Sequence, residues 1–358
     1  MSLSNRLRQL SVFALLGGLL LGANEQADAS ANFIVGVAIH RFGDYRYQSD
    51  MLPRVKQAGM TAIRTDLGWS HIEKTKGVYD FDKEVDRSVD LANQQGIEPV
   101  LILDYGNPLY GDGKKPVSKE AIQGYVNYAQ AVVQHFGNRV RYYEIWNEWE
   151  TVLGNTEPGR VDDYAVLVKA TYPAIKKINP ESVVLVGAVS TGGLTNGWFE
   201  RLAELGALKT ADGLSVHPYV YQLPAECAPE RAFGMIDSLV STLRSRYNVR
   251  LPVYITEIGW PTNQGKFGVS ESVQAQMLER TLSLAAARPY MRGVWWYDLV
   301  DDGDNPTDKE AHFGLLHTAN FEAKPAWSGM QKMTGMLANR LGTSASGSLV
   351  PSPAACAR

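Results

Sequence analysis

The sequence has only two cysteines among its 358 residues and no block of like charge. Its 35 Lys and Arg and 38 Asp and Glu give a formal net charge of -3. Nucleic acid and anionic membrane surfaces are therefore not expected as partners. A Gly-x-Ser-x-Gly motif, a phosphate-binding loop and a Cys-x-x-Cys pair are also missing. Serine-hydrolase, nucleotide and dithiol chemistry thus have no motif to support them.

An apolar run near the N-terminus, LSVFALLGGLLLGA (residues 10–23), follows Arg6 and Arg8. It has about 14 residues, whereas a membrane span needs roughly 20. Small residues two apart then end at Ala29, which is typical of a secretory signal peptide. We expect residues 1–29 to be removed and the chain to be exported to the periplasm or the cell exterior, without stable membrane insertion. The alternative is a membrane anchor.

The two cysteines leave their pairing open. An oxidising compartment could join Cys227 to Cys356, but a free or intermolecular thiol is an equal alternative. Cys356 lies in a tail, residues 343–358, whose Gly, Ser, Ala and Pro content predicts disorder.

The body of the chain, residues 30–342, alternates β-rich apolar runs with amphipathic helical patterns. With 45% hydrophobic and 20% charged residues, the whole chain can bury a large core. One helical pattern, DKEVDRSVDLANQQG, ends at Gly96, and the last helix is expected over Pro325 to Arg340. The eight predicted strands are Phe33 to Ile39, Thr61 to Thr65, Pro99 to Asp104, Val140 to Asn147, Val183 to Ala188, Gly213 to His217, Val253 to Glu257 and Gly293 to Asp298.

Eight strand–helix repeats with nearly continuous apolar strands predict an α/β fold, a single-domain (β/α)8 TIM barrel. The alternative is an open doubly wound sheet, but no Gly-x-Gly-x-x-Gly follows the first strand. In a barrel, the loops after the strands build the active face. The two longer loops, residues 106–121 and 221–235, both follow strands.

Two of the predicted strands end in a glutamate, Glu148 after the fourth strand and Glu257 in the seventh. Both carboxyl groups are expected at the same rim of the barrel, where a ligand reaches them. Two acids on one rim suit the hydrolysis of a glycosidic bond. One acid protonates the leaving oxygen while the other attacks the anomeric carbon, and a separation of about 5 to 5.5 Å gives retention of configuration.

The segments IWNEWE (residues 145–150) and ITEIGWPT (residues 255–262) resemble the acid/base and nucleophile motifs of clan A glycoside hydrolases. The resemblance covers roughly residues 32 to 340 and implies a (β/α)8 barrel. Within the clan, residues 61–81 and LSVHPY (residues 214–219) look most like family 39. That family holds β-xylosidases, α-iduronidases and bacterial enzymes that cut exopolysaccharides.

The resemblance implies a role for each matching residue. Glu148 would be the general acid/base, and Glu257 the nucleophile, kept ionised by Arg64. Asn147 would bind the sugar 2-hydroxyl. His217 and Tyr219 would border the nucleophile, and Trp296 would form the floor under the sugar, because WYDL matches the clan better from Trp296. Strand alternation lets only one of Trp295 and Trp296 face inward and does not decide which.

Other residues allow two interpretations. Arg64 could serve only an ion pair at the barrel mouth, and His40 could be a substrate contact or a core histidine. Glu150, two residues past Glu148, is expected to be a solvated or ion-paired carboxylate. Rings at predicted strand ends suit stacking on sugar faces, although each could simply pack a loop. We expect at least two of them to touch substrate; they are Trp69, Trp149, Trp260, Tyr105 and Tyr110.

These features predict a monomeric, exported, retaining β-glycosidase that uses no cofactor and no metal. Its partner would be a polysaccharide or oligosaccharide substrate. Rings after several different strands favour an open cleft and endo action. The resemblance adds that compact single-barrel members look more like exopolysaccharide hydrolases, because only a short tail follows the last predicted helix. The alternatives are an exo-acting β-xylosidase-like enzyme and a non-catalytic carbohydrate-binding barrel in exopolysaccharide assembly.

Overall fold

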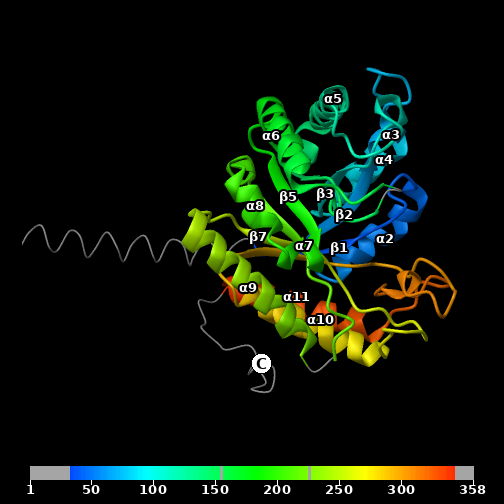
Figure 1. Ribbon diagram of the computed structural model, residues 1–358. Coiled ribbons are helices and arrows are strands. Elements are labelled where there is room, and N and C mark those ends of the chain that lie inside the picture. The colour runs from blue at the N-terminus through cyan, green and yellow to red at the C-terminus, as the bar shows by residue number, and fades with distance from the viewer. Residues whose placement is uncertain (1–32, 154–155, 225–226, 343–358) are drawn as a thin grey trace, which may run out of the picture.

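The computed structural model describes residues 33–153, 156–224 and 227–342 (Figure 1). The predicted signal peptide, the predicted C-terminal tail and Cys356 lie outside these residues, so those expectations stay predictions. Among the described residues, no helix has the length and apolar character that a membrane span requires.

The described strands form one closed parallel barrel, so the predicted (β/α)8 fold is confirmed. Each strand pairs in parallel with the next, and β1 closes the barrel on β8. The bounds of the strands are β1 Ile34–Ala38, β2 Ala62–Gly68, β3 Glu98–Asp104, β4 Tyr142–Ile145, β5 Val183–Ser190, β6 Gly213–His217, β7 Val253–Ile258 and β8 Met291–Trp296.

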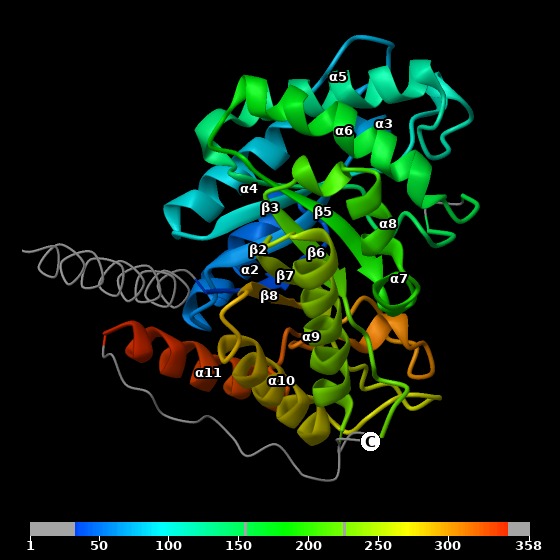
Figure 2. The same cartoon turned by 60° about the vertical axis from the view of Figure 1, so that its left-hand side comes forward.

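Helices cover the outside of the barrel (Figures 1 and 2). Side-chain caps begin several of them: Asp44 accepts a hydrogen bond from the Tyr47 backbone N–H at 3.1 Å, and Ser118 accepts one from Ala121 at 3.1 Å. The bounds of the helices are α2 Tyr45–Gln57, α3 Trp69–Ile72, α4 Lys83–Gln94, α5 Lys119–Phe136, α6 Val161–Ile178, α7 Thr191–Thr195, α8 Trp198–Glu204, α9 Ala228–Tyr247, α10 Glu271–Ala286 and α11 Pro325–Gly342, with short 3-10 turns η1 Pro108–Tyr110, η2 Gly137–Arg139, η3 Ala207–Lys209 and η4 Glu310–His312.

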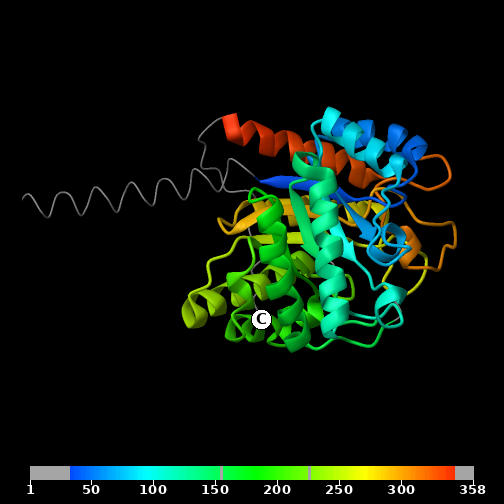
Figure 3. The same ribbon diagram turned by 90° about the horizontal axis from the view of Figure 1, so that it is seen from above.

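The two ends of the barrel domain meet where α11 packs beside α2 (Figure 3). The Thr334 hydroxyl of α11 donates a 2.7 Å hydrogen bond to the carbonyl of Ala58, the residue that follows α2. This contact holds the last helix of the circle against the first. The ring of helices is thereby closed around the sheet.

The core has two parts. A small cluster fills the barrel interior, built from residues on alternate strand positions such as Val100, Tyr142, Tyr254 and Trp295. The larger cluster lies between the strands and the helices. Gly36 faces the Trp295 ring so closely that an added Cβ would overlap it and lie 2.9 Å from the Ala62 carbonyl. The large indole of β8 therefore requires a glycine on β1.

Four of the strand boundaries that differ from the prediction affect where residues of the site lie. Arg64 lies in the middle of β2, which continues to Gly68, rather than at its end. The fourth strand ends at Ile145, so Asn147 and Glu148 stand in the segment that follows it. The first strand ends at Ala38, two residues before His40. The eighth ends at Trp296, ahead of the predicted end at Asp298.

Candidate active site

A cavity of about 540 Å³ opens at the carboxyl ends of the strands. Loops after successive strands converge there because every strand of a parallel barrel ends on the same face. Each of the eight strands contributes to its wall, through itself or the segment that follows it, as shown by His40, Arg64, Tyr105, Glu148, Thr191, Tyr219, Glu257 and Tyr297.

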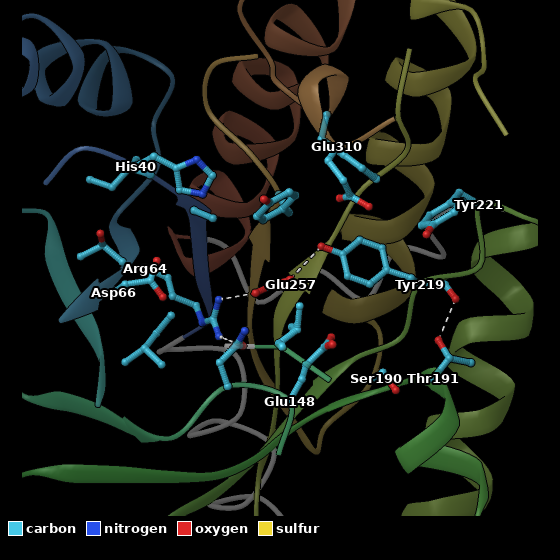
Figure 4. A pocket seen from close by; sticks show the side chains of 18 of the residues that line it. His40, Arg64, Asp66, Glu148, Ser190, Thr191, Tyr219, Tyr221, Glu257 and Glu310 are labelled. Carbon is cyan, nitrogen blue, oxygen red and sulfur yellow. Dashed lines mark hydrogen bonds and ion pairs between the residues drawn. The ribbon is translucent and has the colours of Figure 1, made fainter. Parts of the chain in front are cut away.

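Glu257 stands at the centre of this cavity on β7 (Figure 4). Its Oε1 accepts a 2.6 Å hydrogen bond from the Arg64 guanidinium, and its Oε2 accepts one of 2.9 Å from the Tyr219 hydroxyl. Both carboxylate oxygens are thus held by donors, and the side chain is only 12% exposed. This fixes the carboxylate in one orientation toward the cavity.

Glu148 lies beside it, on the segment after β4. Its backbone adopts a positive φ of 44° and donates a 2.9 Å hydrogen bond to the Ala188 carbonyl. Such left-handed geometry is uncommon outside glycine and concentrates at functional sites. The Glu148 Oε1 lies 3.0 Å from His217 Nδ1. Carboxylate oxygens of Glu148 and Glu257 and a ring nitrogen of His217 all lie within 4.8 Å of one another.

Arg64 binds several side chains of the site and holds them in place. It forms 2.6 Å ion pairs with both Glu144 and Glu257 and donates a 3.0 Å hydrogen bond to the Asn147 side-chain oxygen. The Asn147 amide in turn donates a 3.1 Å hydrogen bond to the Tyr105 hydroxyl. The buried guanidinium thus holds three neighbouring side chains directly, and Tyr105 through Asn147.

Charge in this cluster decides which groups are ionised. Burial opposes ionisation of Glu257, but the positive charges of His217 and Arg64 and the hydrogen bond from Tyr219 outweigh it and lower the pKa of this carboxyl. For His217 burial again opposes the charged form, yet the Glu257 charge and the contact with Glu148 raise its pKa. Glu257 is therefore an ionised carboxylate at neutral pH.

The structure places three of the predicted sugar-stacking indoles outside the cavity. Trp69 and Trp149 are 0% exposed and Trp260 is 1% exposed. Trp69 donates a 2.6 Å hydrogen bond to Glu73, and Trp149 donates one of 3.1 Å to the Arg160 carbonyl. These rings pack the loops against the barrel and offer no free face to a sugar.

The tryptophan pair of β8 is oriented opposite to the prediction. Trp295 fills the barrel interior, so its neighbour Trp296 points outward, is 1% exposed and stacks on Trp260 at 5.9 Å. Strand alternation then returns Tyr297 to the inner side, where it lines the cavity. Tyr297 thus occupies the place that the prediction assigned to Trp296.

The other predicted residues divide between cavity and packing. His40 and Tyr105 line the cavity. His40 is half-buried and its Nδ1 lies 2.7 Å from Asp302 Oδ1; burial lowers its pKa, but Asp302 and Asp298 outweigh this and raise it to about 9. Tyr110 stacks on Trp69 at 4.9 Å instead. Glu150 accepts a 2.6 Å hydrogen bond from the Ser190 backbone N–H, so it is a structural acceptor.

Several residues of the site were not predicted from the sequence. The alternation of side chains along a strand would have placed two of them, Glu144 and Asp66, on the inner side of the barrel. Glu144 is fully buried in the apolar strand YYEI, and Asp66 lies two positions after Arg64 on β2. Tyr221 and Glu310 line the cavity from long loops, where no periodicity marks them.

Among the residues that the structure describes, two sets of side chains could hold a cation, because their donor atoms lie within 4.8 Å of one another. One is Glu148, His217 and Glu257. The other is His40, Asp298 and Asp302. In both sets the histidine already lies within 3.0 Å of a carboxylate. The expectation that no metal is needed stays a prediction.

Comparison with known proteins places the chain among glycoside hydrolases. The sequence model "Cellulase (glycosyl hydrolase family 5)" matches residues 26–298, more than half of the chain. A probable β-galactosidase C from Talaromyces marneffei is 32% identical over 111 residues, which are 29% of this chain and 10% of that protein.

Two solved structures are similar along most of the barrel. A family 39 glycoside hydrolase from the gut symbiont Bacteroides cellulosilyticus superposes with a TM-score of 0.73 at 29% identity, covering 87% of this chain and 65% of that one. A family 39 enzyme from Xanthomonas axonopodis pv. citri gives 0.65 at 18% identity, covering 85% and 66%. The chain spans just under two thirds of each. It belongs to the cellulase (glycosyl hydrolase family 5) family, in the clan A of glycoside hydrolases that its two glutamate motifs indicated.

Proposed function

We propose that this protein is a retaining β-glycosidase that cleaves a polysaccharide by double displacement. The observation that carries the proposal is the pair Glu148 and Glu257, whose nearest carboxylate oxygens lie within 4.8 Å at one cavity. Retaining enzymes hold their two carboxyl groups about 5 to 5.5 Å apart, whereas inverting enzymes need roughly 6.5 to 9.5 Å to admit a water. The short separation supports retention.

The surroundings of each carboxyl support its role. Glu257 is ionised and held by Arg64 and Tyr219, as a nucleophile requires. Its oxygen would attack the anomeric carbon while Glu148 donates a proton to the leaving oxygen. Glu148 would then take a proton from the water that breaks the glycosyl–Glu257 ester, which releases the sugar and restores both acids. Asn147 keeps one amide N–H for the sugar 2-hydroxyl, because Tyr105 takes the other.

The substrate proposal is a β-linked polysaccharide cut within the chain. A cavity of about 540 Å³ falls in the range that encloses a drug-sized ligand, roughly two sugar rings. The buried positions of Trp69, Trp149 and Trp260 remove the stacking argument for a long cleft. What supports endo action instead is that the cavity reaches the ends of all eight strands and has Tyr105, Tyr221 and Tyr297 along its wall. The apolar run at residues 10–23 supports export to the periplasm or beyond.

The test is a polysaccharide panel followed by product sizing and by NMR of the first product. We expect mixed oligosaccharides early in the reaction, with the anomeric configuration of the substrate. Glu257→Gln should abolish hydrolysis, whereas Glu181→Gln, an exposed carboxylate just before β5, should leave it unchanged.

Each part of the proposal has its own contrary result. Inverted product would reject the double displacement. Release of monosaccharide alone, without loss of chain length, would replace endo action by an exo-acting enzyme of the β-xylosidase type. Binding of polysaccharide with no hydrolysis by any preparation would leave the carbohydrate-binding alternative.

A further inference from the structure

We infer that His40, Asp298 and Asp302 form a binding site for a divalent transition-metal ion, with Zn²⁺ as the best match. His40 lies in the segment after β1, and the two aspartates lie in the segment after β8. The ion would stabilise the fold, so the inference does not depend on the proposed glycosidase activity. The expectation that no metal is needed would then apply to catalysis alone.

The three side chains lie at distances that suit a shared ion. His40 Nδ1 is 2.7 Å from an Asp302 oxygen and 3.8 Å from an Asp298 oxygen. Ligands bound to Zn²⁺ at about 2.0 to 2.1 Å in a tetrahedron stand about 3.3 Å apart, a value between these two distances. An imidazole nitrogen and two carboxylate oxygens are ligands that Zn²⁺ accepts.

A pocket of about 130 Å³ is lined by these three residues, between the segments that follow β1 and β8. It has room for an ion and a few waters, because a water takes up about 30 Å³. Zinc sites with three protein ligands complete their coordination with water. His40, labelled in Figure 4, lines both this pocket and the catalytic cavity.

Asp298 is the residue that most needs a cation. Its side chain is 3% exposed, and its Oδ1 is buried without a hydrogen-bond partner among the described residues. Its Oδ2 lies 3.8 Å from His40 Nδ1, which is too far for a hydrogen bond. Buried carboxylates in proteins are normally paired or bind a metal ion.

The basic side chains around the pocket are bound to other acids. Arg41 forms a 2.6 Å ion pair with Asp44. Lys324 is fully buried and forms a 2.7 Å ion pair with Asp301. In the described part of the chain, no Lys or Arg nitrogen lies within 4.0 Å of either aspartate of the site. A metal ion would therefore not have to displace a basic side chain.

A proton on His40 would not replace the ion. It lets Nδ1 donate a hydrogen bond to Asp302, but Asp298 Oδ1 is still left without a donor. A metal ion takes the place of that proton on the ring nitrogen and can contact both carboxylates. Because β1 pairs with β8 to close the barrel, the ion would join the segments that follow the first and the last strand.

The other set of possible ligands, Glu148, His217 and Glu257, suits a cation less well. Both carboxylate oxygens of Glu257 already accept hydrogen bonds, one from Arg64 at 2.6 Å and one from Tyr219 at 2.9 Å. The guanidinium beside them would repel a metal ion. The two sets can be told apart by substitution.

The experiment is calorimetric titration of the metal-free full chain with Zn²⁺, together with thermal unfolding. We expect one ion per chain, and at about 100 times the Kd the Tm should rise by about 3 °C or more. Asp302→Asn, at a side chain that is 38% exposed, should weaken Zn²⁺ binding by about tenfold or more and remove the rise in Tm, because an anionic ligand is lost. His40→Gln should do the same, and it serves as the second test if Asp302→Asn does not fold.

Two control variants locate the ion. Asp304→Asn changes an exposed acid two residues further along, outside the pocket, and should bind Zn²⁺ like the wild type. Glu148→Gln changes the other set of ligands and should also bind like the wild type.

Three results would overturn the inference. They are no binding of Zn²⁺ and no rise in Tm, binding lost in Glu148→Gln but kept in Asp302→Asn, and equal binding by the wild type and every variant. None of these results bears on hydrolysis, and a chain that fails to hydrolyse polysaccharide could still bind the ion. The failure of one proposal is therefore distinguishable from the failure of the other.

Discussion

The hydrogen bond from the Tyr219 hydroxyl to Glu257 gives a direct test of how the nucleophile is kept ionised. Tyr219→Phe removes one oxygen and keeps the ring, which makes edge contacts with Tyr221, Tyr297 and Phe313 at 5.8, 6.4 and 6.0 Å. A hydrogen bond to a charged group contributes about 1.5 to 3 kcal/mol. Since one pKa unit corresponds to about 1.36 kcal/mol, its loss should raise the pKa of Glu257 by about one unit or more.

The assay is the pH dependence of kcat/KM, whose acidic limb reports the ionisation of the nucleophile in the free enzyme. The pKa of Glu257 is lowered from its ordinary value of 4.5 in the folded protein. A carboxyl of this kind stabilises the fold above its unfolded pKa, and the contribution is lost as pH falls through the folded pKa. The variant should therefore show its acidic limb at higher pH, and a loss of stability that is largest near pH 7 and shrinks below about pH 4.

Tyr221→Phe is the matched control, because Tyr221 also lines the cavity but its hydroxyl contacts Lys309 and not Glu257. It should leave the acidic limb in place even if KM changes. An acidic limb that stays where it is in Tyr219→Phe, within about 0.2 pH units, would refute the reasoning that this hydroxyl holds the nucleophile ionised.

Two further predictions separate catalysis from folding. Glu257→Ala should form no glycosyl-enzyme, as measured by mass spectrometry. Glu148→Ala should retain activity on aryl glycosides with good leaving groups, and azide should rescue its second step. Equal losses of activity in both variants on activated and unactivated substrates, without azide rescue, would reverse or reject the two roles. Gly36→Ala should destabilise the barrel by about 1 to 3 kcal/mol in urea unfolding, because its Cβ would overlap the Trp295 ring. The control is Gly234→Ala in helix α9, where an added Cβ meets nothing within 4 Å, and it should be neutral or stabilising by up to about 1 kcal/mol. Similar effects at both positions would contradict the packing argument.

The sequence alone was sufficient to predict the fold and to predict that Glu148 and Glu257 lie together at the mouth of the barrel. Parallel strands buried on both faces leave long apolar runs, and their spacing indicates a helix between each pair. A carboxyl group at the end of such a run is expected at the mouth of the barrel, and the motifs around Glu148 and Glu257 resemble those of clan A, so both were predicted without knowledge of their contacts. The strand end alone does not decide this, because Asp104 ends β3 and is fully buried. These are local signals, and they depend only on residues close together in the chain.

Only the tertiary structure decided which way each side chain points and what it meets. The period of two along a strand determines that Trp295 and Trp296 face opposite sides, but not which of them faces inward, because that depends on register against Gly36 of the neighbouring strand. The loop tryptophans looked like sugar platforms from their positions, yet they are buried, since packing of loops on helices is a long-range property. The network from Glu144 through Arg64 to Glu257 joins three separate strands. Such a network forms only when barrel closure brings distant residues within hydrogen-bonding distance.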